Sequence, residues 1–415
     1  MKVIVSPSRI SGTIDAPQSK SYAIRYIFCS TIAPIELYDL ALSNDVEDAI
    51  EAVKVLGIEY IGGKFVKKGG ELKIVKDYLY LRGSATTLRM FIPIALIVGG
   101  KITIDGDESL RRRPLKAIIE SLENKGVKFS SRSLPLTIEG KLRDTYIEIP
   151  GYESSQYVSG FMIAFAIAGG GTIKITPPIV SKSYINLTAS ILKKIGVDVN
   201  MYSNRIEIDV KDRVSGYTGK VPGDYLLASF YVSSALLTNG RIEVRNLPQP
   251  EEYVGDHIIV DVYKAMGAQS IYIDGVWIAE ASESHKGYRG IDIDVEDSPD
   301  MALSIVPLAS IADGITNIEN VSRLRIKESD RVTEIVKVLK SFGIEVYTDY
   351  KRIRIRGSKP VSGKVVCPND HRIAMMTTPI ALRVGGVIDR AECVEKSNPN
   401  FWNDIVKLGG KIEII

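Results

Sequence analysis

Basic residues stand near the beginning of several strongly apolar segments of the chain. Lys20 and Arg25 lie in SKSYAIR, Arg89 lies in SATTLR, and Arg372 lies in NDHRIAM. If these segments are helices, a cation at the N-terminal end opposes the helix dipole and costs at least a few tenths of a kcal/mol. A bound anion would remove that cost, because the free backbone N–H groups and the dipole also attract it. The pattern therefore predicts a site for phosphate or carboxylate groups.

A second group of basic residues lies outside those segments: Arg113 before Pro114, Lys327 and Arg331 in RIKESDR, and Lys396 in EKSNP. Taken alone, RIKESDR is also typical of a solvated helix face, with Glu and Arg near i,i+3 spacing. Considered together, the eight cations favour a single cleft that binds several anionic groups.

Two acids accompany the cations. Asp300 opens an apolar segment and Glu328 follows Lys327. Helix capping explains a Ser, Asp or Asn at such a start equally well. An acid is not needed to hold anions, however, so we expect both carboxylates to transfer protons. The chain has no Ser-His-Asp arrangement, Walker A loop or GxGxxG motif, which disfavours serine chemistry and ordinary nucleotide binding.

The elements that must position these residues recur six times. The first pattern is an amphipathic stretch followed by a glycine and a short strand, and it repeats at intervals of 66 to 76 residues. The second pattern lies between these copies and consists of a polar opening followed by an apolar run. The glycines are Gly57, Gly126, Gly196, Gly267, Gly343 and Gly409, and the polar openings are at Ser19, Ser84, Ser154, Asp224, Ser298 and Asp370. Each glycine is expected to end a helix, and each apolar run to be a buried helix. Six such units favour two α/β domains of three units, because solenoid repeats, the alternative, are usually shorter.

Composition and charge narrow the class of protein. The 415 residues include 53 basic and 50 acidic side chains, so a general nucleic-acid binder is disfavoured. No apolar stretch reaches the roughly 18–20 residues of a membrane span, and the N-terminus lacks the features of a signal peptide. We therefore expect a cytoplasmic protein that binds neither membrane nor nucleic acid.

Cysteine and histidine spacing argues against two further kinds of site. Cys29, Cys367 and Cys393 share no CxxC spacing, so we expect neither a disulfide framework nor a zinc knuckle. The three histidines, His257, His285 and His371, form no HxxxH pair, so a histidine-rich metal site is not expected.

Ten short segments in order resemble the EPSP synthase (3-phosphoshikimate 1-carboxyvinyltransferase) family: SKSYAIR, SATTLR, RRRP, SSQYVSG, VSKSYI, PGD, SPDM, LRIKESDR, NDHRIAM and EKSNP. The resemblance implies an α/β fold of two domains, each built from three βαβαββ-type repeats with pseudo-three-fold symmetry, like an inside-out barrel. Residues 19–221 would form the domain on the 3-phosphoshikimate side. Residues 1–18 and 222–415 would form the domain with the catalytic acids, and the active site would lie in the cleft between them.

The resemblance also implies roles for individual residues. Contacts to 3-phosphoshikimate are implied for Lys20, Ser21, Arg25, Ser154, Ser155, Gln156, Ser181, Tyr184, Asp300 and Lys327. Contacts to phosphoenolpyruvate are implied for Lys20, Ala85, Arg89, Arg113, Gln156, Arg331, His371, Arg372 and Lys396. Catalytic roles are implied for Asp300, Glu328 and Lys20. The family transfers the enolpyruvyl group to the 5-hydroxyl of 3-phosphoshikimate in chorismate and aromatic amino acid biosynthesis, without metal or organic cofactor, and we expect a monomer.

Three positions depart from the family pattern. Gly83 replaces a usual asparagine, and Arg323 stands where many members have an asparagine that contacts the shikimate phosphate, so neither role is assigned. Ala85 replaces the glycine of members sensitive to glyphosate, a competitor of phosphoenolpyruvate. Since a methyl group beside that pocket would clash with the longer inhibitor, tolerance is expected. Greater helix propensity of alanine is the alternative reason for its presence.

Two other functions fit the sequence less well. The sister enzyme acting on UDP-N-acetylglucosamine usually has asparagine after its leading lysine and a cysteine on a mobile loop, whereas this chain has Ser21 and no cysteine in GDESLRRRP. A six-unit DNA clamp requires basic residues along exposed helix faces. Here the cations stand at the ends of apolar segments, which disfavours the clamp.

Overall fold

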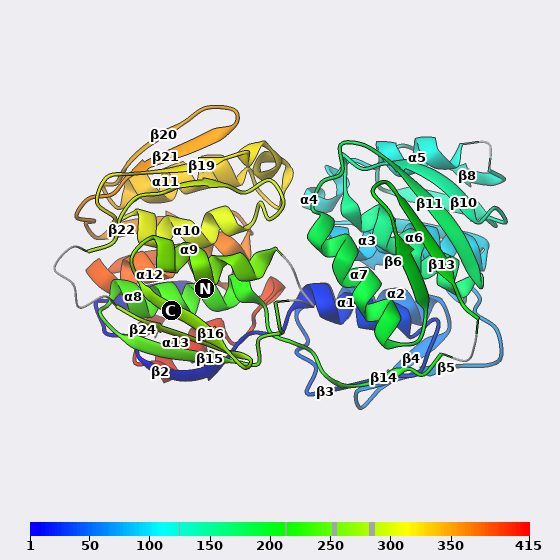
Figure 1. Ribbon diagram of the computed structural model, residues 1–415, viewed down its shortest axis with the longest axis horizontal. Coiled ribbons are helices and arrows are strands. Elements are labelled where there is room, and N and C mark those ends of the chain that lie inside the picture. Colours follow the sequence, from blue (N-terminus) through cyan, green and yellow to red (C-terminus); the bar gives the residue numbers. More distant parts are fainter. Residues whose placement is uncertain (124, 212–213, 251–254, 282–286) are drawn as a thin grey trace. The chain divides into compact units, whose positions relative to one another are not determined.

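A computed structural model describes the chain except residues 124, 212–213, 251–254 and 282–286. The chain divides into two compact units, one made of Met1–Gln18 with Pro222–Ile415 and the other of Ser19–Val221. Within the described residues, each unit contains three four-stranded sheets, and helices lie beside the sheets (Figure 1). None of the helices in the described part of the chain is long and apolar enough to cross a membrane.

The unit Ser19–Val221 follows the repeat expected from the sequence. Its helices are α1 (Lys20–Cys29), α2 (Asn44–Val55), α3 (Ala85–Val98), α4 (Glu108–Arg111), α5 (Lys116–Leu122), α6 (Ser155–Ile167) and α7 (Lys182–Lys194). Its strands are β3 (Ile35–Tyr38), β4 (Ile58–Ile61), β5 (Lys64–Lys67), β6 (Tyr78–Leu81), β7 (Gly100–Gly106), β8 (Val127–Phe129), β9 (Leu136–Gly140), β10 (Tyr146–Pro150), β11 (Gly170–Thr176), β12 (Asp198–Met201), β13 (Arg205–Asp209) and β14 (Tyr217–Lys220).

The other unit repeats the same sequence of elements. Its helices are α8 (Tyr225–Leu237), α9 (Ile259–Ala265), α10 (Met301–Ala309), α11 (Arg331–Ser341), α12 (His371–Val384) and α13 (Phe401–Lys407), with the 3₁₀ helices η1 (Asp256–Ile258), η2 (Val321–Ile326) and η3 (Ala391–Lys396). Its strands are β1 (Lys2–Ser6), β2 (Gly12–Asp15), β15 (Arg241–Arg245), β16 (Gln269–Ile273), β17 (Val276–Glu280), β18 (Asp292–Asp294), β19 (Ile315–Glu319), β20 (Glu345–Thr348), β21 (Arg352–Arg356), β22 (Gly363–Val366), β23 (Gly386–Asp389) and β24 (Lys411–Ile414).

All six sheets share one pairing pattern. In the sheet β6-β7-β9-β8, β6 and β7 are parallel, whereas β7–β9 and β9–β8 are antiparallel. The two N-terminal strands belong to sheets formed by the C-terminal part of the chain. Strand β1 pairs antiparallel with β23 and β24, and β2 pairs parallel with β15, so both sheets have the same pattern. The expected βαβαββ repeat and α/β fold class are therefore confirmed.

The apolar runs are the buried helices that the sequence predicts. Every residue of α8 is buried, and α8, α10 and α12 pack against one another within their unit. In the other unit α3 packs against α6. Gly160 permits this approach, because a Cβ there would lie 2.8 Å from the Cα of Met90.

The helix-ending glycines are confirmed as well. Gly57, Gly126, Gly196, Gly267, Gly343 and Gly409 all have positive φ, between 74° and 104°. A left-handed residue at this place redirects the chain from each helix into the next strand, and glycine adopts that conformation without steric cost.

The expectation about cysteines was wrong for one pair. Cys367 and Cys393 form a disulfide, and Cys29 is a free, buried cysteine. CxxC spacing reports only local pairs, whereas this bond joins the segments before α12 and within η3, which the fold brings together. Among the described residues no group of histidines, cysteines and acids could hold a metal, and His285 lies outside them.

Candidate active site

Lys20, the first residue of α1, makes a salt bridge within its own unit. Its Nζ lies 2.6 Å from Oδ2 of Asp45 near the start of α2. The Asp45 side chain is buried, so the carboxylate holds the ammonium in one position. A lysine side chain has four flexible carbons, and such a fixed partner reduces the entropy lost when an anion binds.

Arg25 is almost fully buried at 2 % exposure and is held by three elements. Its Nη1 donates to the carbonyl of Ser21 at 2.9 Å, and its Nε donates to Oγ1 of Thr188 at 2.8 Å. Its Nη2 reaches Oγ of Ser159 at 3.3 Å and the carbonyl of Tyr184 at 3.2 Å. The guanidinium also lies 5.9 Å from the centre of the Tyr184 ring. This network ties α1, α6 and α7 together around the positive charge.

Arg89 and Gln156 connect the N-terminal parts of α3 and α6. Nη1 of Arg89 donates to Oε1 of Gln156 at 3.2 Å, and Nε2 of Gln156 donates to Oγ1 of Thr86 at 2.8 Å. Oγ of Ser154 accepts from the backbone N–H of Gln156 and so caps α6. Arg89 also donates to the carbonyl of Pro114, which places Arg89 beside the Arg113 segment. These contacts bring Arg89, Gln156 and Ser154 together near the beginnings of α3 and α6.

Ser181 has an unusual backbone conformation. It precedes α7 with φ of 50° and ψ of 50°, in the left-handed region that a serine rarely adopts. Strained residues of this kind cluster at ligand-binding sites. Ser181 is buried and lies three residues before Tyr184, whose ring faces Arg25. Ser21, Ser155 and Ala85 occupy the first turns of α1, α6 and α3 respectively.

In the other unit Arg331 is surrounded by carboxylates. Nη1 of Arg331 lies 2.6 Å from Oδ1 of Asp300, and Nη2 lies 2.8 Å from Oε2 of Glu328. Nε lies 2.8 Å from Oδ2 of Asp370. The Arg331 side chain is only 1 % exposed, so these carboxylates balance a buried charge.

Asp300 is shared among cations. Its Oδ1 lies 3.0 Å from Nζ of Lys327, and its Oδ2 lies 3.6 Å from Nε of Arg372. Burial opposes ionisation of Asp300, but attraction to Lys327, Arg331 and Arg372 outweighs it and holds the pKa of the carboxyl well below its usual value. Burial lowers the pKa of Lys327, and attraction to Asp300 only partly offsets this effect.

The remaining expected residues of this unit lie near that cluster. His371 and Arg372 begin α12, where the backbone N–H of Arg372 donates to Oδ1 of the capping Asp370 at 3.2 Å. His371 is fully buried, with Nδ1 3.9 Å from Oδ1 of Asp370. Lys396 ends η3, which packs against α12.

Two supporting carboxylates were missed at the sequence level. Asp45 pairs with Lys20, and Asp370 pairs with Arg331 and caps α12. The sequence pattern marks Asp370 as a helix opening, and its place inside NDHRIAM, beside Arg372, is the signal that could have indicated its further role. Asp45 lies 25 residues from its partner, and no local pattern marks that contact.

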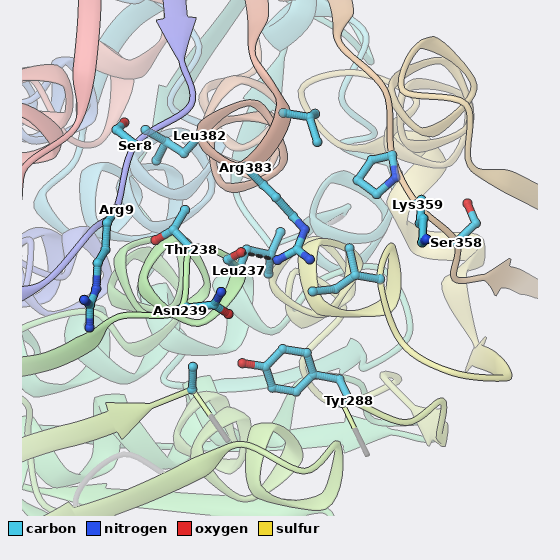
Figure 2. Close-up of a pocket in the computed structure, with 15 residues that line it drawn as sticks. Ser8, Arg9, Leu237, Thr238, Asn239, Tyr288, Ser358, Lys359, Leu382 and Arg383 are labelled. Atoms are coloured by element: carbon cyan, nitrogen blue, oxygen red, sulfur yellow. Dashed lines mark hydrogen bonds between the residues drawn. The ribbon is translucent and has the colours of Figure 1, made fainter. Parts of the chain in front are cut away.

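A cavity of about 840 Å³ lies in the unit containing α8, α10 and α12. Figure 2 shows side chains that line it. Its lining includes the residues after α8 and the end of α12, with Arg9, Lys359 and Arg383 as its cations. Nη1 of Arg383 donates to the carbonyl of Leu237 at 2.5 Å. Arg383 lies in the last turn of α12, where a cation balances the negative end of the helix dipole and needs no bound anion. Asp300 and Arg372 lie at the opposite, N-terminal ends of α10 and α12, and the cavity is separate from their cluster.

Comparison with known proteins agrees with this chemistry. The model of the family described as EPSP synthase (3-phosphoshikimate 1-carboxyvinyltransferase) matches residues 4–405. A 3-phosphoshikimate 1-carboxyvinyltransferase from Saccharolobus islandicus is 50 % identical, and one from Sulfurisphaera tokodaii is 47 % identical, each over the full length of both chains. The solved structure of EPSP synthase from Acinetobacter baumannii superimposes with a TM-score of 0.81 at 23 % identity, covering both chains completely, which supports the fold.

Proposed function

Because this chain belongs to the EPSP synthase family, we propose that it transfers the enolpyruvyl group of phosphoenolpyruvate to the 5-hydroxyl of 3-phosphoshikimate. The observation that carries the assignment of the site is the arrangement around Arg331, where Asp300 and Glu328 lie on one guanidinium beside Lys327 and Arg372. Two proton-transferring acids among cations suit a reaction between two polyanions.

The cluster of unit Ser19–Val221 binds 3-phosphoshikimate in this proposal. Arg25 and Ser181 hold its phosphate, since a buried guanidinium and a strained helix start both favour an anion. Ser21, Ser154, Ser155, Gln156 and Tyr184 contact the phosphate, the hydroxyl groups or the ring, and Asp300 and Lys327 contribute from the other unit.

Phosphoenolpyruvate is held by the cations of both units. Lys20, Arg89 and Arg113 contribute from one unit, with Ala85 and Gln156 beside them, and Arg331, His371, Arg372 and Lys396 contribute from the other. Because the two substrates react with each other, the two clusters must reach the same pair of molecules.

In this proposal each acid carries out one proton transfer. Asp300 accepts the proton of the 5-hydroxyl as its oxygen bonds to C2 of phosphoenolpyruvate, and Glu328 with Lys20 delivers a proton to C3. The resulting tetrahedral ketal phosphate then loses phosphate, and a proton leaves C3, which gives the enolpyruvyl ether. A carboxylate with a strongly lowered pKa is a weak base. The negative charges of bound substrates would offset the attraction of Lys327, Arg331 and Arg372 for the Asp300 carboxylate. The pKa of Asp300 would then rise, which makes it a stronger base.

One assay tests the function. Phosphate release from phosphoenolpyruvate should require 3-phosphoshikimate and should not occur with UDP-N-acetylglucosamine in its place. Release with the nucleotide sugar alone would contradict the assignment.

The same proposal places a monomeric enzyme in the cytoplasm, where phosphoenolpyruvate is available, with no nucleic-acid partner. Size-exclusion chromatography and the absence of duplex DNA binding at low salt would support that part.

A further inference from the structure

The segment that carries Lys396 is not part of a long regular element. Lys396 is the last residue of η3, a 3₁₀ helix of six residues. Helices of this type are short and poorly stabilised by their own hydrogen bonds. The backbone of such a segment therefore needs contacts to other elements if Lys396 is to be held in one place.

One such contact is covalent. Cys393 lies three residues before Lys396, and its disulfide partner Cys367 lies three residues before Asp370, the N-cap of α12. Both sulfur atoms are near the carbonyl oxygen of Asp370, at 3.3 Å for Cys367 and 3.9 Å for Cys393. The bond therefore joins the Lys396 segment to the helix start that carries Arg372.

The second contact lies on the other side of Lys396. Nδ2 of Asn398 donates to the hydroxyl of Tyr231 on α8 at 2.7 Å, and that hydroxyl donates to Oδ2 of Asp404 at 2.8 Å. Asn398 is 5 % exposed, so this hydrogen bond is shielded from water. Lys396 consequently stands between two fixed points, Cys393 and Asn398.

We propose that the Cys367–Cys393 disulfide is a positioning element for phosphoenolpyruvate binding, which fixes the Lys396 segment against the start of α12. The inference rests on the proposed role of Lys396 as a phosphoenolpyruvate contact. Breaking the bond releases one of the two fixed points, so Lys396 loses more conformational freedom when the substrate binds. Binding of 3-phosphoshikimate depends mainly on the other unit, in which Cys29 is the only cysteine, and is unaffected.

The first test counts thiols in the native full-length chain. Unfolding without a reductant followed by maleimide labelling should modify one cysteine, Cys29, and labelling after treatment with dithiothreitol should modify all three. The reductant supplies two electrons and two protons, so the S–S bond becomes two thiols while dithiothreitol closes to its own disulfide. Three labelled cysteines before reduction, with peptide mapping to exclude loss during handling, would overturn the proposal.

The second test measures steady-state kinetics. The double variant Cys367→Ala/Cys393→Ala and the reduced native enzyme should both show KM for phosphoenolpyruvate raised by about 3- to 10-fold, less than the loss of a full charge-assisted contact. The Kd for 3-phosphoshikimate should stay within about twofold. Reduction should have the same effect on Cys29→Ala and no further effect on the double variant. An unchanged KM, with only a lower melting temperature, would leave the bond merely structural and refute the inference.

The variant Lys396→Ala separates this inference from the proposed function. If its KM for phosphoenolpyruvate equals that of the native enzyme, the role of Lys396 fails and the positioning proposal fails with it. If Lys396→Ala raises KM but breaking the disulfide does not, the role of Lys396 stands and the positioning proposal alone is refuted.

Discussion

Nε of Arg331 lies 2.8 Å from Oδ2 of Asp370, with both side chains at 1 % exposure or less. The same carboxylate accepts from Oγ of Ser329 and caps the first turn of α12. Asp370 thereby connects α11, which begins at Arg331, to the helix start that carries His371 and Arg372. The relative positions of three proposed substrate contacts thus depend on one buried carboxylate.

Asp370→Ala should strongly destabilise its unit. Removing one partner of a buried ion pair typically costs about 3–5 kcal/mol, and because Asp300 and Glu328 remain on Arg331 we expect about 3. Urea unfolding followed by circular dichroism measures the change. Glu345→Ala, which removes a partner of exposed Arg356, is the control and should cost less than about 1 kcal/mol. Equal losses for the two variants would contradict the buried role of Asp370.

Asp300→Asn should retain 3-phosphoshikimate binding and lose most turnover. The amide keeps the shape of the side chain but cannot accept the hydroxyl proton, so kcat should fall by about 10²- to 10⁴-fold. Calorimetry for 3-phosphoshikimate and a phosphate-release assay separate binding from chemistry. Full activity in this variant would remove Asp300 from the mechanism.

Arg113→Ala and Lys396→Ala should each weaken phosphoenolpyruvate binding. A lost charge-assisted hydrogen bond is worth about 1.5–3 kcal/mol, or about 10- to 150-fold in affinity. KM for each substrate gives the comparison, with Lys364→Ala, whose partner is Asp389, as a surface control. The assignment would be wrong if both variants kept the native KM for phosphoenolpyruvate.

Ala85→Gly should increase sensitivity to glyphosate. Ala85 is the first residue of α3, one residue before Thr86, which accepts from Gln156. The methyl group should clash with the inhibitor more than with the shorter substrate at a cost of about 1–3 kcal/mol, of which 1.4 already gives about tenfold. The inhibition constant should therefore fall at least severalfold in the variant, while KM for phosphoenolpyruvate changes much less. A native enzyme as sensitive as the variant would refute the steric explanation.

Asp404 should make stability depend on pH. Burial raises the pKa of its carboxyl above 3.8, although the hydrogen bond from Tyr231 opposes the shift. The folded state then binds more protons than the unfolded state, so unfolding free energy falls as pH rises from about 3.8 through the raised pKa. Asp404→Asn can still accept from Tyr231 and should reduce this fall. Thermal unfolding across that range measures it, and identical pH profiles for the two proteins would disprove the contribution of Asp404.

Much of the fold could be predicted because its signals are local and repeated. The alternation of apolar runs with glycine-ended amphipathic stretches predicted the two helices of each of the six repeats. Helix burial and left-handed helix ends can be predicted in this way because they depend on neighbouring residues. The motifs around Lys20, Arg89 and Arg372 indicated the family and the anionic character of its substrates. These conclusions needed no knowledge of which distant residues meet.

The tertiary structure alone decided which charges are paired. The salt bridge of Lys20 with Asp45, the contacts of Arg331 with Asp300 and Asp370, and the disulfide between Cys367 and Cys393 all join separate elements, whereas Glu328 lies only three residues before Arg331. Residue type and spacing show that a cation stands at a helix start, but its pKa and freedom depend on the neighbours that packing supplies. The sequence by itself therefore determined the repeat, the family and the candidate residues, whereas folding determined how Asp370 and Asp45 hold those residues in place.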